Sequence, residues 1–171
     1  MDTGYVDVLP PEESSRLAKQ LKRHEGLRLA AYFDSEGVLT VGYGHNCQAW
    51  PVPGVTKAGD KISQAQADLL FQIDMELAEA QAGHAMPWMK DLNYPRRAVL
   101  INMVFNMGVG SGASGRGVMG FKRMHSALRQ GGYARASREM LDSRWAGQVG
   151  PRARELAAQM ESGTWPGVLY V

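Results

Sequence analysis

Glu25, Asp34 and Thr40 lie close together in the sequence and have side chains that can move a proton and hold a water molecule. Glu25 falls on the apolar stripe of a predicted helix, near its C-terminal end, where burial and the helix dipole both favour the protonated carboxyl group. Asp34 begins a predicted turn, a wetter position in which a carboxylate stays ionised. Thr40 points away from the apolar face of a predicted strand and can hydrogen-bond a water molecule or the aspartate. Cleavage of a glycosidic bond requires one protonated and one ionised carboxyl group, so the trio is a candidate site for that chemistry.

Each of the three residues also has an ordinary structural interpretation. Asp34 is of the type that closes an Asx turn, Thr40 is a common strand former, and Glu25 is a common acid of helix surfaces. Both interpretations stay open on these residues alone.

The elements that would position the trio are a helix and a hairpin. The helix is predicted to begin near Pro11, because proline suits the first helical position. It is predicted to end near Glu25, because Gly26 can adopt the left-handed conformation that often follows the last residue of a helix. Residues 29–33 and 38–43 are predicted strands, and 34–37 is the turn between them. The hairpin therefore carries both Asp34 and Thr40.

The rest of the chain is predicted to be mainly helical. Ser63 and Gln66 form a capping-box pattern that opens a long helix ending near Gly83, about 30 Å long at roughly 1.5 Å per residue. Further helices are predicted at 96–107, 121–130, 132–141 and 151–160, and an exposed connection is predicted at 48–60. The pattern indicates an α+β protein in which a small β-containing lobe is attached to a helical bundle.

Other motifs give no support to a nucleotide or metal site. Gly110, Gly112 and Gly115 match the dinucleotide-binding spacing, but they follow a helical segment rather than a strand. A flexible loop, either beside a site or simply on the surface, is the preferred interpretation. The four histidines lack metal-ligand spacing, and the single Cys47 excludes an intramolecular disulfide. We therefore expect neither a cofactor nor a metal.

Composition and charge favour a globular chain with one basic region. The 171 residues are 44% hydrophobic and 21% charged, and no window of 18 apolar residues suggests a membrane span. Residues 96–160 hold eleven Lys and Arg against three Asp and Glu, although the whole chain has a net charge of only +2. Such a region attracts a polyanion, which charge alone does not identify: nucleic acid, an anionic membrane or the bacterial cell wall. The N-terminus lacks a secretory pattern, so we expect a cytoplasmic location until release.

The order of residues around the trio resembles the T-even bacteriophage type lysozymes, glycoside hydrolase family 24. Glu25, Asp34 and Thr40 reproduce the family's E-x8-D-x5-T pattern. The resemblance extends from about residue 14 to residue 165 and rests on further landmarks in the same order: 24–29, Tyr32, Gly37, Gly42, Gly44, His45, 70–71, Asp74, 97–108, 143–145 and 163–165.

This resemblance implies a lysozyme-like α+β fold in one domain, residues 1–171. Residues 28–74 would form the small β-containing lobe, and residues 1–27 and 75–171 the larger helical lobe. A long helix would join the lobes, with the active-site cleft between them.

The resemblance also implies an endo-acting muramidase that cleaves peptidoglycan between N-acetylmuramic acid and N-acetylglucosamine. Glu25 would be the general acid, and Asp34 and Thr40 would position the attacking water, with inversion at the anomeric carbon. Further roles would follow from the same likeness: substrate contact by Asn106, Phe105 and Arg144, a structural ion pair between His45 and Asp74, and a pairing of Arg152 with Glu25 that opposes protonation of the acid.

The expected biology is that of an endolysin, a monomer that lyses the host by cutting its wall. Its basic helical region would help to hold the anionic wall, with transient contact to an anionic membrane as a further possibility. Two alternatives stay open: a lytic transglycosylase, which works with one catalytic glutamate, and a non-catalytic module that binds the wall or nucleic acid. Nucleic acid is the least favoured partner, because no recognition motif accompanies the charge.

Overall fold

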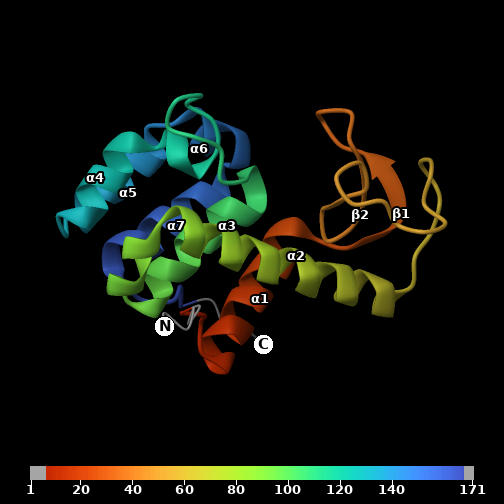
Figure 1. The fold of residues 1–171 in the computed structure, drawn as a ribbon, viewed down its shortest axis with the longest axis horizontal. Coiled ribbons are helices and arrows are strands. Elements are labelled where there is room, and N and C mark those ends of the chain that lie inside the picture. The colour runs from red at the N-terminus through yellow and green to blue at the C-terminus, as the bar shows by residue number, and fades with distance from the viewer. Residues whose placement is uncertain (1–6, 168–171) are drawn as a thin grey trace, which may run out of the picture. The chain divides into compact units, whose positions relative to one another are not determined.

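The computed structural model describes residues 7–167, which form helices and one small antiparallel sheet (Figure 1). The elements in chain order are α1 (Pro11–Glu25), β1 (Arg28–Phe33), β2 (Leu39–Gly42), β3 (His45–Asn46), α2 (Gln64–Ala85), η1 (Pro87–Asp91), α3 (Tyr94–Met107), η2 (Val118–Gly120), α4 (Lys122–Arg129), α5 (Tyr133–Leu141), α6 (Arg144–Val149) and α7 (Pro151–Ser162). The predicted α+β class is confirmed. The chain divides into two compact units: a sheet unit, Ala18–Leu77, and a helical unit that holds the chain up to Leu17 and from Ala78 onward.

The sheet unit is built on the antiparallel order β1-β2-β3. Tyr32 pairs with Thr40 between the first two strands, and Val41 pairs with His45 between the last two. All four residues of β2 are buried, so this strand forms the centre of the unit. Its core is a cluster of small and branched apolar side chains: Ala31, Leu39, Val41, Cys47, Val52, Val55, Ile62 and Ala67.

The long helix α2 begins as the capping-box pattern predicts. The backbone N–H of Ser63 donates to Oε1 of Gln66 at 2.8 Å, and the backbone N–H of Gln66 donates to Oγ of Ser63 at 3.1 Å. These reciprocal bonds satisfy two donors that a helix start otherwise leaves without partners. They define the residue at which α2 begins.

The helical unit is organised around α3. An unbroken run of buried residues, 97–104, shows that this helix is enclosed on all sides. The largest of the fully buried side chains in the unit come from several helices: Leu17, Met86, Leu100, Ile101, Met103, Met124, Met140, Leu156, Gln159 and Met160. The methionines fill irregular space here, as unbranched side chains do in many cores.

The connection 48–60 is mainly exposed, as predicted, but two of its side chains are not. Val52 and Val55 are buried in the sheet unit's core. Asp60 folds the segment on itself: its Oδ2 accepts from the backbone N–H of Thr56 at 2.8 Å and of Lys57 at 3.1 Å. The two buried valines explain how a segment with several prolines and glycines stays attached to the unit.

Residues 109–120, which we call the glycine strap, form a turn that backbone hydrogen bonds close. The backbone N–H of Ser111 donates to the carbonyl of Arg116 at 3.1 Å, and that of Met119 donates to the carbonyl of Val109 at 2.8 Å. Gly110 and Gly117 have φ values of +62° and +64°, and a Cβ atom on either would overlap the backbone of the other arm. The glycines therefore permit a close turn rather than an open loop.

No helix among residues 7–167 is long and apolar enough to cross a membrane.

Candidate functional site

Glu25 is the last residue of α1 and is half-buried. Its carboxylate lies against the turn between β2 and β3: a Cβ atom on residue 44 would stand 2.9 Å from Oε2 and 3.6 Å from Cδ. Gly44 has a φ of +78°, which also favours glycine. The absence of a side chain at residue 44 thus provides the space that the carboxylate occupies.

Lys22, one turn before Glu25, ties the end of α1 to α2. Its Nζ donates to Oδ1 of Asp68 at 2.8 Å. The same ammonium group lies 4.8 Å from the ring centre of Tyr43 and 5.1 Å from that of Phe71. A cation held by a carboxylate and two rings fixes the helix end that carries Glu25.

Asp34 follows β1 directly and organises the hairpin turn. Its Oδ1 accepts from the backbone N–H of Glu36 at 2.9 Å and from that of Val38 at 2.8 Å. This is the Asx-turn role that the sequence left open, and it coexists with a functional one because neither bond uses Oδ2. The half-buried carboxylate is therefore held in place through Oδ1, and no hydrogen bond to Oδ2 is formed among residues 7–167.

Thr40 is buried, with 4% of its surface exposed, and its Oγ1 donates to the carbonyl of Val38 at 2.9 Å. Thr40 and Asp34 are thereby linked through Val38, and the predicted ability of the hydroxyl to bind a water molecule or Asp34 stays a prediction. The N–H of Val38 binds Asp34 and its carbonyl binds Thr40. One residue thus sets the positions of both side chains, and no residue type in the sequence signals this backbone role.

Tyr32 is a further member of this group that received no role from the sequence beyond its place in the resemblance. It pairs with Thr40 across β1 and β2, and the Arg28 guanidinium lies 3.7 Å from its ring centre. Burial raises the pKa of Tyr32 against the opposing effect of Arg28, and the charges of Glu25 and Asp34 raise it further. The phenol therefore lies within electrostatic reach of both carboxylates.

His45 connects β3 to α2. Its Nδ1 lies 2.8 Å from Oδ2 of Asp74, and its Nε2 lies 2.9 Å from the carbonyl oxygen of Trp50. Because both ring nitrogens face acceptors, only the doubly protonated imidazolium can donate both bonds. Burial lowers the pKa of His45, but the bonds to Asp74 and Trp50 and the charge of Asp74 outweigh it and raise the pKa above 6.5.

We therefore expect Asp74→Asn to destabilise the protein by about 1 kcal/mol more at pH 5.5 than at pH 9. A histidine whose folded pKa is raised contributes stability that is complete below the unfolded pKa near 6.5, and this contribution is lost as the pH rises through the folded pKa. Urea unfolding at the two pH values measures the difference. Glu76→Gln, which removes an exposed charge on the same helix, should show little pH dependence; an equal loss at both pH values for Asp74→Asn would contradict the prediction.

The predicted substrate contacts Asn106, Phe105 and Arg144 belong to the helical unit. Oδ1 of Asn106 accepts from Nε1 of Trp145 at 2.7 Å, so the amide is oriented by an indole. Phe105 is half-buried on α3, next to Asn106. Arg144 opens α6 and lines a pocket of about 590 Å³.

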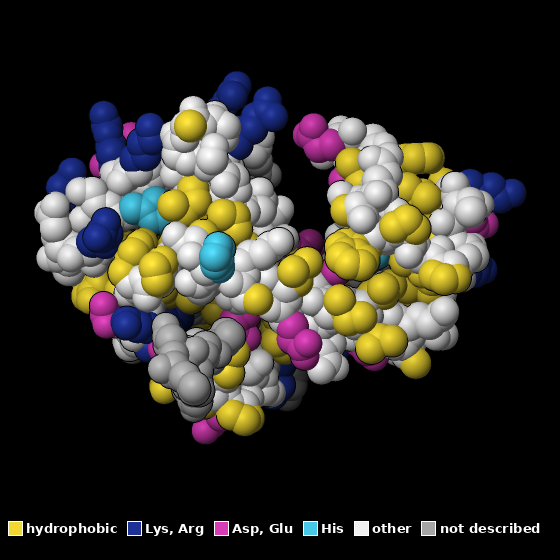
Figure 2. Space-filling view, viewed as in Figure 1, with side chains coloured by type: hydrophobic (Ala, Val, Ile, Leu, Met, Phe, Trp, Pro, Cys, Tyr) yellow, Lys and Arg dark blue, Asp and Glu magenta, His cyan; other side chains and the backbone are white. Residues whose placement is uncertain are grey.

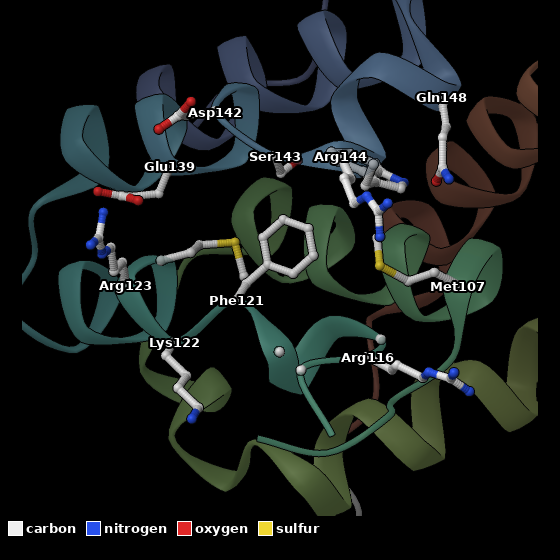
Figure 3. Close-up of a pocket in the computed structure, with 15 residues that line it drawn as sticks. Met107, Arg116, Phe121, Lys122, Arg123, Glu139, Asp142, Ser143, Arg144 and Gln148 are labelled. Carbon is white, nitrogen blue, oxygen red and sulfur yellow. The ribbon is translucent and has the colours of Figure 1, made fainter. Parts of the chain in front are cut away.

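This pocket, which we call the α5–α6 pocket, combines aromatic and charged side chains (Figure 3). The Phe121 ring lies between Arg123 and Glu139 on one side and Arg116 and Arg144 on the other. Phe121 also packs edge-on against Trp145, with ring centres 6.0 Å apart at 83°. Sequence reasoning missed Phe121 and Glu139, whose positions carry no local motif, whereas Trp145 was visible as a landmark beside Arg144.

Arg152 donates from Nε and Nη2 to Oδ1 of Asn102, at 3.0 and 2.8 Å. This bidentate contact places the guanidinium against the enclosed helix α3. Its pairing with Glu25, which the resemblance implies, stays a prediction.

Among residues 7–167 no group of three or more His, Cys, Asp or Glu side chains could hold a metal ion.

Comparison with known proteins identifies the class. A family model described as phage lysozyme matches residues 22–160. The pre-baseplate central spike protein Gp5 of Enterobacteria phage T4 is 30% identical and aligns with 89% of this chain, which spans only 29% of that protein. Probable T4-type lysozyme 1 of Dictyostelium discoideum is 29% identical over 88% of this chain and 96% of its own length. The endolysin of Salmonella phage P22 is 33% identical over 56% of this chain and 62% of its own length.

The α+β fold and these matches define a glycoside hydrolase of the lysozyme class. The chain belongs to the phage lysozyme family, as the order of its residues predicted.

Proposed function

We propose that this lysozyme is an endo-acting muramidase that hydrolyses the β-1,4 bond between N-acetylmuramic acid and N-acetylglucosamine in bacterial peptidoglycan. The observation that carries the proposal is the seating of the Glu25 carboxylate against Gly44, in the same compact unit as Asp34 and Thr40. A proton donor and a positioned carboxylate on one unit meet the minimum requirement for cleaving an acetal by general acid catalysis.

In the proposed reaction Glu25 gives its proton to the glycosidic oxygen, and the bond from that oxygen to the anomeric carbon breaks. Asp34 and Thr40 hold a water molecule on the opposite face of the sugar. The water attacks the anomeric carbon and loses its proton to Asp34, which gives inversion. Asp34 and Thr40 both bond to the backbone of Val38, which supports this assignment because it fixes the positions of the two side chains relative to each other.

Asn106, Phe105 and Arg144 would contact the glycan or its peptide substituents from the helical unit. The α5–α6 pocket supports this part of the proposal, since an aromatic surface packs against sugar rings and flanking charges suit the ionised groups of wall peptides.

The biological role that follows is lysis of a bacterial host, with the enzyme reaching the wall after release from the cytoplasm. The P22 relative, an endolysin, supports that role.

Mass spectrometry of muropeptides released from purified peptidoglycan tests the proposed reaction. Hydrolysis by a muramidase leaves a reducing N-acetylmuramic acid end that carries the added water. A lytic transglycosylase leaves a 1,6-anhydro end, 18 Da lighter by the loss of that water, and this product would overturn the proposal. Release of no muropeptide at all, with the protein sedimenting on the wall, would instead favour a binding module.

A further inference from the structure

A second concave surface lies on the other side of α4, and we call it the α4 groove. Its volume is about 490 Å³, and of its described lining residues only Lys122 also lines the α5–α6 pocket. Among residues 7–167 its lining is Gly112, Met119, Lys122, His125, Ser126, Arg129 and Gln130. Lys122, Ser126 and Arg129 are spaced four and three residues apart, so they lie on one face of the helix.

The walls of the groove are held by contacts to neighbouring segments. The glycine strap approaches at Gly112, where a Cβ atom would lie 3.6 Å from Cε of Lys122. The His125 ring packs edge-on against Trp88, with ring centres 5.6 Å apart, and its Nε2 lies 2.8 Å from the Val118 carbonyl oxygen. These contacts hold the walls of the groove in place.

The positive charge of the groove at neutral pH comes from Lys122 and Arg129. Burial lowers the pKa of His125, and the charge of Arg129 acts in the same direction against the raising effect of the bond to Val118. His125 is therefore a neutral wall residue near pH 7. Ser126 and Gln130 lie between and beside the two cations and supply neutral polar groups, with Nε2 of Gln130 3.3 Å from Oγ of Ser126.

Carboxylates are absent from this part of the sequence. From Leu92 to Arg138, 47 consecutive residues include eight Lys and Arg and no Asp or Glu. Among the residues that the structure describes, no carboxylate forms an ion pair with Lys122 or Arg129. Figure 2 shows Lys and Arg side chains projecting to solvent around this part of the helical unit. The α5–α6 pocket differs, because Glu139 and Asp142 line it together with its cations.

We propose that the α4 groove binds the phosphate groups of a polyol-phosphate chain, a linear anionic polymer of the kind that poly(glycerol phosphate) represents. Lys122 and Arg129 are seven residues apart, about 10 Å along the helix at roughly 1.5 Å per residue, so they suit charges that recur along one chain. Ammonium and guanidinium groups make charge-assisted hydrogen bonds to phosphate oxygens. Ser126 and Gln130 can donate further bonds to the same oxygens.

The lining favours this polymer over two other phosphate-bearing partners. Binding of single-stranded nucleic acid relies on aromatic side chains on which bases stack, and among the residues that the structure describes no Phe, Tyr or Trp lines the groove. Docking on a bilayer relies on exposed Trp, Phe or Leu beside the cations, and the apolar residues of α4, Met124, Ala127 and Leu128, are buried. A phosphodiester chain with a small polar backbone needs neither feature.

The proposal is tested by comparing Arg129→Glu with Arg135→Glu, because the two variant proteins have the same net charge. Arg129 and Arg135 are both exposed, but only Arg129 lines the groove. We expect Arg129→Glu to weaken binding of a poly(glycerol phosphate) chain of about ten units at least tenfold at about 50 mM salt, and Arg135→Glu less than about threefold. Titration calorimetry on the full chain measures both values and requires no glycan cleavage, so the result is separate from the proposed reaction.

Three other probes are compared with the polymer: glycerol 3-phosphate, a thymidine oligonucleotide with the same number of phosphates, and vesicles that contain phosphatidylglycerol. We expect the polymer to bind more tightly than each of them to the parent protein, and Lys122→Gln to weaken polymer binding as well. Equal losses in the two glutamate variants would show diffuse charge rather than a groove and would overturn the proposal. Tighter binding of the oligonucleotide or the vesicles would overturn the choice of polymer. Thermal melting checks that each variant folds, and Arg129→Gln replaces Arg129→Glu if the reversal prevents folding.

Discussion

Glu25→Gln is expected to lower the rate of peptidoglycan cleavage by about 10³-fold or more while leaving the fold intact. The amide has nearly the same shape as the carboxyl group and fits the space beside Gly44, but it has no acidic proton to give to the glycosidic oxygen. General acid catalysis contributes on the order of 10² to 10⁴ in rate, so removal of the proton donor should dominate every other single change. Release of reducing ends from purified peptidoglycan measures the rate.

Glu76→Gln is the matched control for this variant. Glu76 is an exposed acid of α2 in the same compact unit, and its Oε1 accepts only from the neighbouring Gln72 in the described bonds, at 3.0 Å. Its replacement removes the same charge without touching the trio, so the rate should stay within about twofold of the parent. A Glu25→Gln protein that cleaves within tenfold of the parent would remove Glu25 from the role of general acid.

Contacts within the sheet unit hold the three proposed catalytic side chains in place. Glu25 ends a helix that Lys22 fastens to Asp68, and the Asp34 and Thr40 side chains are both bonded to the backbone of one residue, Val38. Supporting contacts of this kind reduce the freedom of a catalytic group before substrate arrives. Substrate contacts, by contrast, are proposed from the helical unit, where Trp145 orients Asn106.

Local signals in the sequence predicted the elements that carry the trio. The helix ending at Glu25, the hairpin and the start of α2 at Ser63 each depend on neighbours within four residues, which is the range that capping and turn patterns describe. β3 was missed because two residues have no periodicity and pair only through contact with β2. α6 was missed because six residues are too few for a periodic pattern, although Ser143 accepts from the N–H of Ala146 as a cap and could have marked it.

The supporting contacts of the site were beyond the reach of sequence patterns. The role of Val38 lies in its backbone, so its side chain gives no sign of it. The approach of Glu25 to Gly44 joins residues that belong to different elements, and the glycine spacing alone does not reveal what fills the space. The glycine strap was predicted to be flexible because composition shows the conformational freedom of glycine but not the close backbone contacts that require it.

Gly44→Ala is expected to lower the rate of glycan cleavage by about 10- to 100-fold, whereas Gly26→Ala should change it less than about threefold. Both glycines have positive φ values, +78° and +67°, so both substitutions carry a similar backbone strain of about 1 kcal/mol. Only at residue 44 would the new Cβ atom stand 2.9 Å from Oε2 of Glu25; nothing lies within 4 Å of a Cβ atom at residue 26. The difference between the variants therefore isolates displacement of the carboxylate, and shifts of about 1 Å in a catalytic group can cost about 10² in rate.

Rates on purified peptidoglycan, with thermal melting to compare stability, measure the two effects separately. Both variants should lose similar stability, so a rate difference between them reports on Glu25 rather than on folding. Adding Gly44→Ala to Glu25→Gln should cause little further loss of rate, because the displaced group no longer gives a proton and the two changes act on the same step. Full additivity of the two losses, or equal rates for the Gly44 and Gly26 variants, would show that the space beside residue 44 has no part in holding the acid.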